Sequence, residues 1–433
     1  MLYLINISNY KEEKKNMFNL AFYCDMTGIQ NSNVSSILSG NPGIGGTQYL
    51  FLLITTLLND RYKKTSNNVS LYIKGHFSKY DSNTPIIEVD SFAHCLSLLK
   101  QVNKRYKGNT IIVIRECEVL NSLGIIKKNN YNFVVWAHNT ITIRLQRIIS
   151  KTPNINKIVC VSESQYKNMS FLPFYHDKCT FINNCYPRNY FYDKQTSWDE
   201  HSAIYIGAAV PQKGMHNLLK IWKHVSSKDE KAKLYIVGGV KLRNRNSKAG
   251  NWGITSKSYE YILHLFLKRL NRKQVEFLGV LSSDELKKYM QHVKVGIVNP
   301  SKVMRDETFC MGAVELQAYG IPVVSRKRGD GLETSILNGE TGFLEKKDIM
   351  IANRIQQLLQ DVNLCKEMGT KGQEYVKKFN SECAIEFWDN LVHQIINSRP
   401  EIIYKNSFSL NKENLYLIHD MLLQKLFNII MKI

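Results

Sequence analysis

Short apolar runs alternate with longer apolar or amphipathic segments along most of the chain, which predicts strands alternating with helices. The first run, FNLAFYC at residues 18–24, predicts a buried strand, and YLFLLITTLL after a glycine-rich turn predicts a buried helix. Further strands are predicted at residues 69–73, 111–115, 133–137 and 157–161. This alternation indicates an α/β fold with parallel sheets and right-handed crossovers.

A polar stretch at residues 193–200, DKQTSWDE, interrupts the first series and predicts a linker. A second series follows, in which AIYIGAAVPQKGMHNLLKIW and VEFLGVLSSDELKKYM each predict strand, turn and helix, with Ser283 as the expected cap of the latter helix. The segment at residues 25–43 is longer than a simple turn and is predicted to act as a mobile lid.

The stretch at residues 307–325, ETFCMGAVELQAYGIPVVS, predicts a loop, a short helix and a buried strand. Gly320 and Pro322 end the helix, whose positive N-terminal end is a ready site for an anion. Carboxylates near a phosphate repel it, so Glu307 and Glu315 are better suited to accept hydrogen bonds from hydroxyls. A ligand with a diphosphate and hydroxyl-rich rings, such as a nucleotide sugar, fits this stretch. The alternative is an ordinary amphipathic helix with two solvated acids.

This stretch resembles the signature of retaining glycosyltransferases of the GT-B fold, specifically the large family four, in its two glutamates and the following A-x-G-x-P-V-V. The resemblance implies two Rossmann-like domains that face each other across a cleft, with helices at the C-terminus. Residues 1–195 would form the acceptor domain and residues 200–380 the nucleotide-sugar donor domain. A helix at residues 381–398 would cross back to the N-terminal domain, and residues 399–433 would form a helical tail.

A second resemblance lies in the glycine turn of the C-terminal series. Gly207, Lys213 and Gly214 match the family's G-R-x-x-x-x-K-G turn, whose two cations stabilise the departing diphosphate. Ala208 stands where the family usually has the arginine. Stabilisation of the leaving group would therefore be weaker here, or another group would supply it.

The candidate catalytic residues are Glu307, His138 and Lys213. His138 follows a predicted strand in WAHNT, and ligands of open α/β sheets bind at the carboxyl ends of strands. The alternative for His138 is a structural histidine, with Asn139 or Thr140 capping the next helix. The resemblance implies that Glu315 binds the ribose of the donor and that Glu307 binds its sugar. The donor-binding residues that it implies are Gly45, Gly46, Gly207, Lys213, Gly279, Thr308, Phe309, Cys310 and Glu315.

The composition of the chain limits which binding partners and which cellular compartment are expected for the protein. The net charge of +21 favours nucleic acid, an anionic membrane surface or a phosphorylated substrate, or reflects a lysine-rich solvated surface. No zinc-finger, RRM-like or basic-zipper pattern supports nucleic acid, so we expect none as a partner. Nine cysteines without a C-x-x-C favour free thiols in the cytoplasm. We find no signal peptide and no apolar window long enough to span a bilayer, so association with the inner membrane face would be peripheral.

No D-x-D motif is present, so the sequence offers no ligands for a metal that bridges the diphosphate. We expect no metal and no cofactor beyond the donor substrate, a UDP- or GDP-sugar. The tail sequence LYLIHDMLLQKLFNIIMKI carries a polar stripe on an apolar helix. It fits packing on the protein, pairing with a partner helix or lying in a membrane interface, and we favour packing.

The predicted function is retaining transfer of a sugar from a nucleotide-sugar donor to a glycan or lipid-linked acceptor, in surface polysaccharide biosynthesis. One alternative is a catalytically silent GT-B subunit that binds glycans or scaffolds a partner, which Ala208 favours. The other is a nucleotide-sugar epimerase on the same fold.

Overall fold

The computed structural model describes residues 17–81, 83–170, 178–188, 198, 201–242, 244–302 and 307–397. The predicted tail helix and most of the predicted linker at residues 193–200 lie outside these ranges. Within the described ranges, no helix combines the length and apolarity that crossing a bilayer requires.

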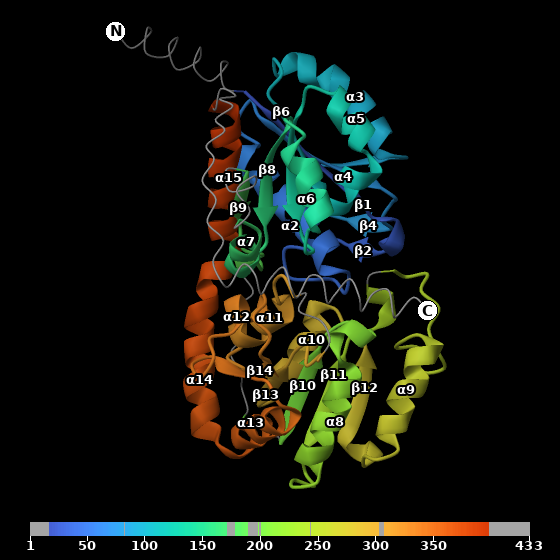
Figure 1. Ribbon diagram of the computed structural model, residues 1–433, viewed down its shortest axis with the longest axis vertical. Helices are drawn as coiled ribbons and strands as arrows, with labels where there is room; N and C mark the ends of the chain where they lie inside the picture. Colours follow the sequence, from blue (N-terminus) through green and yellow to red (C-terminus); the bar gives the residue numbers. More distant parts are fainter. Residues whose placement is uncertain are drawn as a thin grey trace.

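The N-terminal half is built on a seven-stranded parallel sheet with the order β5-β3-β1-β6-β7-β8-β9. Its strands are β1 (Asn19–Asp25), β3 (Asn68–Lys74), β5 (Ile86–Val89), β6 (Thr110–Arg115), β7 (Asn132–Ala137), β8 (Ile155–Cys160) and β9 (Cys179–Phe181). Its helices are α2 (Gly46–Tyr62), α3 (Phe92–Arg105), α4 (Glu116–Asn121), α5 (Leu123–Lys128), α6 (Ile143–Ser150) and α7 (Glu163–Ser170). The first six residues of β1 are buried, because helices cover both faces of the sheet (Figure 1).

The C-terminal half is built on a six-stranded parallel sheet with the order β12-β11-β10-β13-β14-β15. Its strands are β10 (Ser202–Ile206), β11 (Lys233–Val237), β12 (Val275–Gly279), β13 (Val295–Ile297), β14 (Val323–Arg326) and β15 (Gly342–Glu345). Its helices are α8 (Met215–Ser226), α9 (Lys257–Leu267), α10 (Ser283–Met290), α11 (Met311–Ala318), α12 (Leu332–Ser335), α13 (Asp348–Gln360) and α14 (Val362–Val376). In both sheets later strands add on either side of the first strand, the doubly wound order of a Rossmann-like fold.

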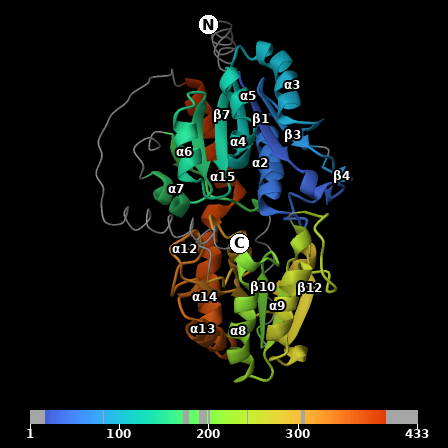
Figure 2. The same cartoon turned by 45° about the vertical axis from the view of Figure 1, so that its right-hand side comes forward.

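Helix α15 (Ser381–Asn397) runs beside the N-terminal sheet, whereas α14 before it lies beside the C-terminal sheet (Figures 1 and 2). Asp389 on α15 accepts hydrogen bonds from Arg61, at 2.8 Å, and from the Tyr62 hydroxyl. Trp388 packs edge-on against Phe22 and Trp136, with ring centroids 5.6 and 5.0 Å apart. The last described helix therefore contributes to the N-terminal core.

The segment at residues 25–43 spans from the N-terminal sheet to the C-terminal half. It contains the short strand β2 (Asn33–Val34), which pairs with β4 (Lys79–Tyr80). Its last residue, Gly43, accepts a hydrogen bond from Arg245 Nη2 at 2.9 Å. The segment thus bridges the two halves along one rim of the space between them.

One predicted cap is wrong. The N-cap of α10 is Ser282, whose hydroxyl accepts from the amide of Glu285 while the Glu285 carboxylate accepts from Ser282. Ser283 instead lies in the first turn, where its amide and hydroxyl both donate to the carbonyl of Asn41, each at 3.0 Å. Only Ser282 has a glutamate three residues later, so the reciprocal bonds of a capping box with Glu285 are open to Ser282 and not to Ser283.

Candidate functional site

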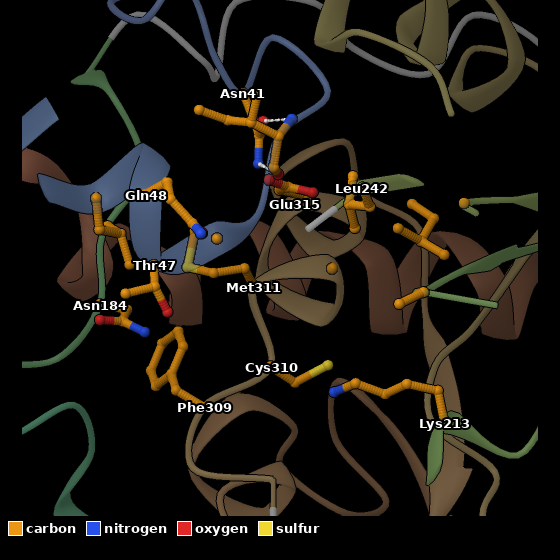
Figure 3. Close-up of a pocket in the computed structure, with 18 of the residues that line it drawn as sticks. Asn41, Thr47, Gln48, Asn184, Lys213, Leu242, Phe309, Cys310, Met311 and Glu315 are labelled. Atoms are coloured by element: carbon orange, nitrogen blue, oxygen red, sulfur yellow. Dashed lines mark hydrogen bonds between the residues drawn. The ribbon is translucent and has the colours of Figure 1, made fainter. Parts of the chain in front are cut away.

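A cleft of about 320 Å³ lies between the two halves, at the carboxyl ends of both sheets. Residues from both halves line it (Figure 3). Of the residues predicted from the sequence, those that line it are Gly46, His138, Gly207, Lys213, Glu307, Thr308, Phe309, Cys310 and Glu315. Gly45 caps the start of α2 and Gly279 ends β12, and neither reaches the lining, although the adjacent Gly46 and Val280 do.

The turn from β10 to α8 brings Lys213 to the cleft. Gly214 after it has a φ of +75°, and a Cβ there would lie 2.4 Å from the Cα of Ser301. Gly238 packs as closely, because a Cβ there would lie 1.9 Å from the carbonyl oxygen of Gly207. The turn is therefore fixed by backbone contacts that only glycine permits. Ala208 lies in this turn, buried and lining the cleft.

Lys213 and Glu307 form an ion pair at the centre of the site. Asn299 also donates to Glu307, from Nδ2 to Oε2 at 2.6 Å. Burial by itself would raise the pKa of Glu307, but the Lys213 ammonium and the Asn299 hydrogen bond outweigh it and hold this pKa below its ordinary value. Glu307 is therefore a carboxylate at neutral pH, and it acts as a hydrogen-bond acceptor rather than as an acid.

A second buried ion pair supports the first. Arg328 Nε donates to Asp330 at 2.9 Å, and both side chains are at most 5% exposed. Arg328 Nη1 also donates to the side-chain oxygen of Asn299 at 3.1 Å, which directs the amide nitrogen of Asn299 toward Glu307. The amide of Gly331 donates to the carbonyl of Glu307 at 2.6 Å. These contacts fix both the backbone and the carboxylate of Glu307.

Helix α11 begins at the cleft with Cys310 as its N-cap residue. Figure 3 shows Lys213 pointing toward Cys310 at this end. The amides of Met311 and Gly312 have no acceptor within the described ranges, so the helix end presents free donors beside a lysine. This is a suitable arrangement for a diphosphate.

Glu315 lies one turn further along α11 and lines the same cleft. Burial raises the pKa of Glu315 from 4.5 to about 7. No described residue donates a hydrogen bond to its carboxylate, in contrast to Glu307. Glu315 is therefore an acceptor without a protein donor in the described ranges, and its charge changes near neutral pH.

Thr308, Phe309 and Cys310 connect α11 to its surroundings. Thr308 Oγ1 donates to the carbonyl of His138 at 2.8 Å, a direct bond between the two halves. Phe309 packs edge-on against Phe379 at 5.1 Å between centroids. Burial raises the pKa of the Cys310 thiol to about 12, so this side chain is a neutral, apolar part of the wall.

His138 closes the N-terminal side of the cleft. Its ring packs against Trp136, with centroids 4.5 Å apart, and its buried Nε2 has no hydrogen-bond partner in the described part of the chain. Burial and the nearby Arg115 hold the pKa of His138 well below its ordinary value, so the ring is neutral. The alternative that Asn139 or Thr140 caps the next helix is wrong, because Thr142 caps α6.

Glu116 anchors this wall. Its carboxylate accepts from the amide of His138 at 3.1 Å, from the Asn139 side chain, and from Arg115 at 3.4 Å. Arg115, His138 and Asn139 all line the cleft. The N-terminal wall therefore presents polar groups that are held in place and face the C-terminal wall.

The sequence did not single out several residues that the structure places at the site. Asp330 lies in the segment GDGLETSILNGETGFL at residues 329–344, and Arg328 directly precedes it. In the sequence, this segment is notable only for its glycines. Asn299 lies in the run VGIVNPS, and neither its hydrogen bond to Glu307 nor its φ of +38° can be read from that run. Arg245 and Asn41 join the two halves at the cleft rim, which requires knowledge of the domain arrangement.

Two Rossmann-like sheets that face each other across such a cleft define the GT-B fold, so the predicted fold is confirmed. Residues 191–375, most of the C-terminal half, match the family described as glycosyl transferases group 1.

The chain is also similar to individual glycosyltransferases. The chain is 28% identical over 336 residues to an uncharacterized glycosyltransferase of Methanocaldococcus jannaschii, covering 72% of this chain and 87% of that protein. It is 30% identical over 190 residues to the capsular polysaccharide biosynthesis glycosyltransferase CapM of Staphylococcus aureus, covering 43% of each. The crystal structure of HepE from Anabaena in complex with UDP and glucose superposes with a TM-score of 0.62 at 15% identity, covering 87% of this chain and 99% of that one.

Proposed function

We propose that the protein is a retaining glycosyltransferase of family four that moves a sugar from a nucleotide-sugar donor to a glycan or lipid-linked acceptor in surface polysaccharide biosynthesis. The observation that carries this proposal is the convergence of Lys213, the start of α11, Glu307 and Glu315 on one cleft. The group 1 match and the similarity to CapM support it. The proposed place of action is the cytoplasm, at the inner face of the membrane.

The donor is a UDP- or GDP-sugar in this proposal. Lys213 and the free amides of Met311 and Gly312 hold the diphosphate, and Glu315 accepts from the ribose hydroxyls. Glu307, kept ionised by its partners, accepts from the sugar hydroxyls and orients the ring. Because Lys213 already pairs with Glu307, the same lysine joins the sugar-binding acid to the leaving group.

The proposed reaction is front-face substitution with retention. The bond between the anomeric carbon and the phosphate oxygen breaks, and the acceptor oxygen bonds to that carbon on the same face. The acceptor proton passes to the departing phosphate. Lys213 and the helix end stabilise the negative charge that develops on the diphosphate, so the residues supply this charge compensation without a metal ion.

The acceptor hydroxyl would approach from the N-terminal wall. The free Nε2 of neutral His138 is suited to a hydrogen bond with that hydroxyl or with the donor sugar. Arg115 and Asn139 beside it offer donors for further acceptor groups. The bond from Thr308 to His138 holds this wall against the donor site, which excludes water during transfer.

A donor screen with mass analysis tests the proposal. The purified chain is incubated with UDP- and GDP-sugars and with lipid-linked and oligosaccharide acceptors. We expect the acceptor to gain the mass of one sugar while one nucleotide is released. The new glycosidic bond should have the donor's anomeric configuration by NMR, and EDTA should leave the rate unchanged. A donor converted to its epimer without a glycosidic product would instead establish an epimerase.

Ala208 gives the silent-subunit alternative its one specific support, because it removes a cation from the leaving-group site. Nucleotide binding without turnover of any donor in the same screen would establish that alternative. Restoring the cation with Ala208→Arg then separates the two cases, since a weakened enzyme gains rate and a scaffold does not.

A further inference from the structure

Helix α9 exposes an apolar face that the donor site does not use. Tyr261, Ile262 and Leu265 are 66%, 41% and 45% exposed. Their spacing places the three side chains on one side of the helix. Residues Tyr259, Leu263 and Leu267 lie on the other side, where they pack into the C-terminal core. Three large apolar side chains on one exposed helix face indicate a contact surface.

Cations surround these three side chains. Exposed lysines and arginines in and after α9 are Lys257, Lys268, Arg269, Arg272 and Lys273. No carboxylate within the described ranges forms an ion pair with any of them. We call these five cations, together with Tyr261, Ile262 and Leu265, the α9 face.

The α9 face carries no exposed acid. Glu260 is the single acidic residue in residues 256–275, and it is buried. Its carboxylate accepts from the amides of Asn251 and Trp252, each at 2.9 Å, so it is committed to the loop before the helix. No exposed acid in residues 256–275 therefore offsets these charges; the acids Asp229 and Glu230 lie beside Lys273, since their carbonyls accept from Gln274.

The position of α9 relates this face to the cleft. Figure 1 shows α9 at the margin of the C-terminal half, next to the edge strand β12. The connection that leads from β11 into α9 carries Leu242, which lines the cleft, and Arg245, which bonds to Gly43 across the rim. The start of α9 therefore lies on the cleft side of the C-terminal half, whereas Lys268, Arg269, Arg272 and Lys273 precede the first residue of β12, at the end of the sheet away from the cleft.

We infer that the α9 face binds an anionic lipid surface, with Tyr261, Ile262 and Leu265 entering the interface and the five cations contacting lipid headgroups. An apolar helix face flanked by lysine and arginine is the pattern that lies in a membrane interface. A second copy of the chain fits less well, because a two-fold contact would place these cations against themselves. The inference concerns a surface outside the donor site and does not depend on the proposed reaction.

The test is co-sedimentation of the full chain with vesicles of phosphatidylglycerol and phosphatidylcholine, compared with phosphatidylcholine alone. We expect binding only to the anionic vesicles, decreasing as salt rises. Replacing the charges with Lys268→Gln and Arg269→Gln should weaken binding roughly 25-fold, about fivefold for each cation. Replacing the apolar group with Tyr261→Ser, Ile262→Ser and Leu265→Ser should weaken it about tenfold or more.

A matched control lies in the N-terminal half, where Leu120, Ile125, Lys127 and Lys128 are also exposed. Serine at the first two and glutamine at the other two should leave vesicle binding unchanged. Equal loss in the control, unchanged binding in both α9 variants, or no binding by the wild type would each overturn the inference. A wild type that self-associates in sedimentation velocity, with the serine variant monomeric but still vesicle-bound, would instead make the α9 face an interface between copies.

Discussion

The pairing of Lys213 with Glu307 joins the two chemical tasks of the proposed site in one contact. The ammonium lowers the pKa of the carboxylate, and the carboxylate holds the ammonium at the start of α11. Asn299, positioned by Arg328, fills a further acceptor site of Glu307. The site is thus preorganised in the free protein, so little reorganisation is needed when charge develops on a leaving group.

Removal of this lysine gives the first prediction. Lys213→Ala should lower kcat with the preferred donor about 100- to 1,000-fold, the range for loss of one preorganised donor to a developing negative charge. Lys213→Arg should keep part of the activity because the charge remains. Steady-state kinetics measure the effect, and Lys223→Ala, an exposed lysine on α8, is the control. An active Lys213→Ala enzyme would remove Lys213 from the mechanism.

Glu315 gives a prediction about pH. Its pKa of about 7 lies above its ordinary value, and ribose hydroxyls need the ionised form as acceptor. Nucleotide affinity should therefore be greatest above pH 7 and fall as the pH decreases through that value, approaching tenfold per unit. Glu315→Gln should bind more weakly at pH 8 and lose this component of the pH dependence. Titration calorimetry from pH 6 to pH 8 on both proteins measures the difference, and parallel pH profiles would contradict the role.

The same shift has a consequence for stability. Because burial raises the pKa of Glu315, folding favours the protonated form, and stability present at low pH is lost as the pH rises through about 7. Glu315→Gln should therefore raise the free energy of unfolding at pH 8, by up to about 3 kcal/mol, and have little effect at pH 4. Urea unfolding at the two pH values tests this, and an equal effect at both would show that the gain has another origin.

At the scale of single residues, the sequence predicts the site residues that belong to local motifs. It does not predict the distant residues that hold them in place. Glu307 and Lys213 stand out because each lies in a turn just before a helix, and Glu315 because it lies one turn into the helix that follows Glu307. Arg328 acts on Asn299 from 29 positions away, and nothing local distinguishes it from a solvated arginine. Its partner Asp330 is likewise an ordinary acid in a glycine-rich segment.

At the scale of elements, the turn between β10 and α8 is the part that positions Lys213. Gly214→Ala would require a left-handed φ of +75° and would place a methyl group 2.4 Å from the Cα of Ser301. We expect a loss of unfolding free energy of about 3 kcal/mol or more, with loss of activity. Gly108→Ala is the control, because its φ is +88° but open space surrounds its Cβ position, so the cost there should be only about 1 kcal/mol. Chemical denaturation compares the two, and equal costs would show that the close contact with Ser301 is unimportant.

The alternation of strands and helices is predictable because buried parallel strands are short, continuous apolar runs. The end of the helix in the 307–325 stretch is also predictable, since Gly320 takes a φ of +77° and β14 begins directly after Pro322. Caps are harder. The sequence around α10 favours Ser282, because Glu285 lies three residues later as a capping box requires, and only the fold shows that Ser283 is used to hold Asn41.

At the scale of the whole molecule, two kinds of contact join the halves. Thr308 bonds to His138 inside the cleft, and Ser164 bonds to Thr334 at 2.6 Å outside it. Helix α15 supplies the other kind, since it follows α14 of the C-terminal half and packs into the N-terminal core. The sequence indicates that a terminal helix exists, but partners hundreds of residues apart are fixed only by the assembled fold.

The contribution of α15 can be measured through Asp389. Asp389→Ala removes the acceptor of Arg61 and leaves the hydroxyl of the buried Tyr62 unpaired. The unfolding free energy should fall by about 1–3 kcal/mol. Urea unfolding followed by tryptophan fluorescence reports this, since Trp136 and Trp388 are buried together. Glu386→Ala, an exposed acid on the same helix, should have no effect, and an equal loss there would contradict the assignment.

The most direct measurement of the central claim is a calorimetric titration of the wild type, Lys213→Ala and Glu315→Gln with UDP and GDP and with the corresponding nucleosides at pH 8. We predict that Lys213→Ala weakens binding of the preferred diphosphate while leaving the nucleoside unchanged, and that Glu315→Gln weakens both. Nucleotide binding as tight in both variants as in the wild type would show that this cleft does not hold the donor.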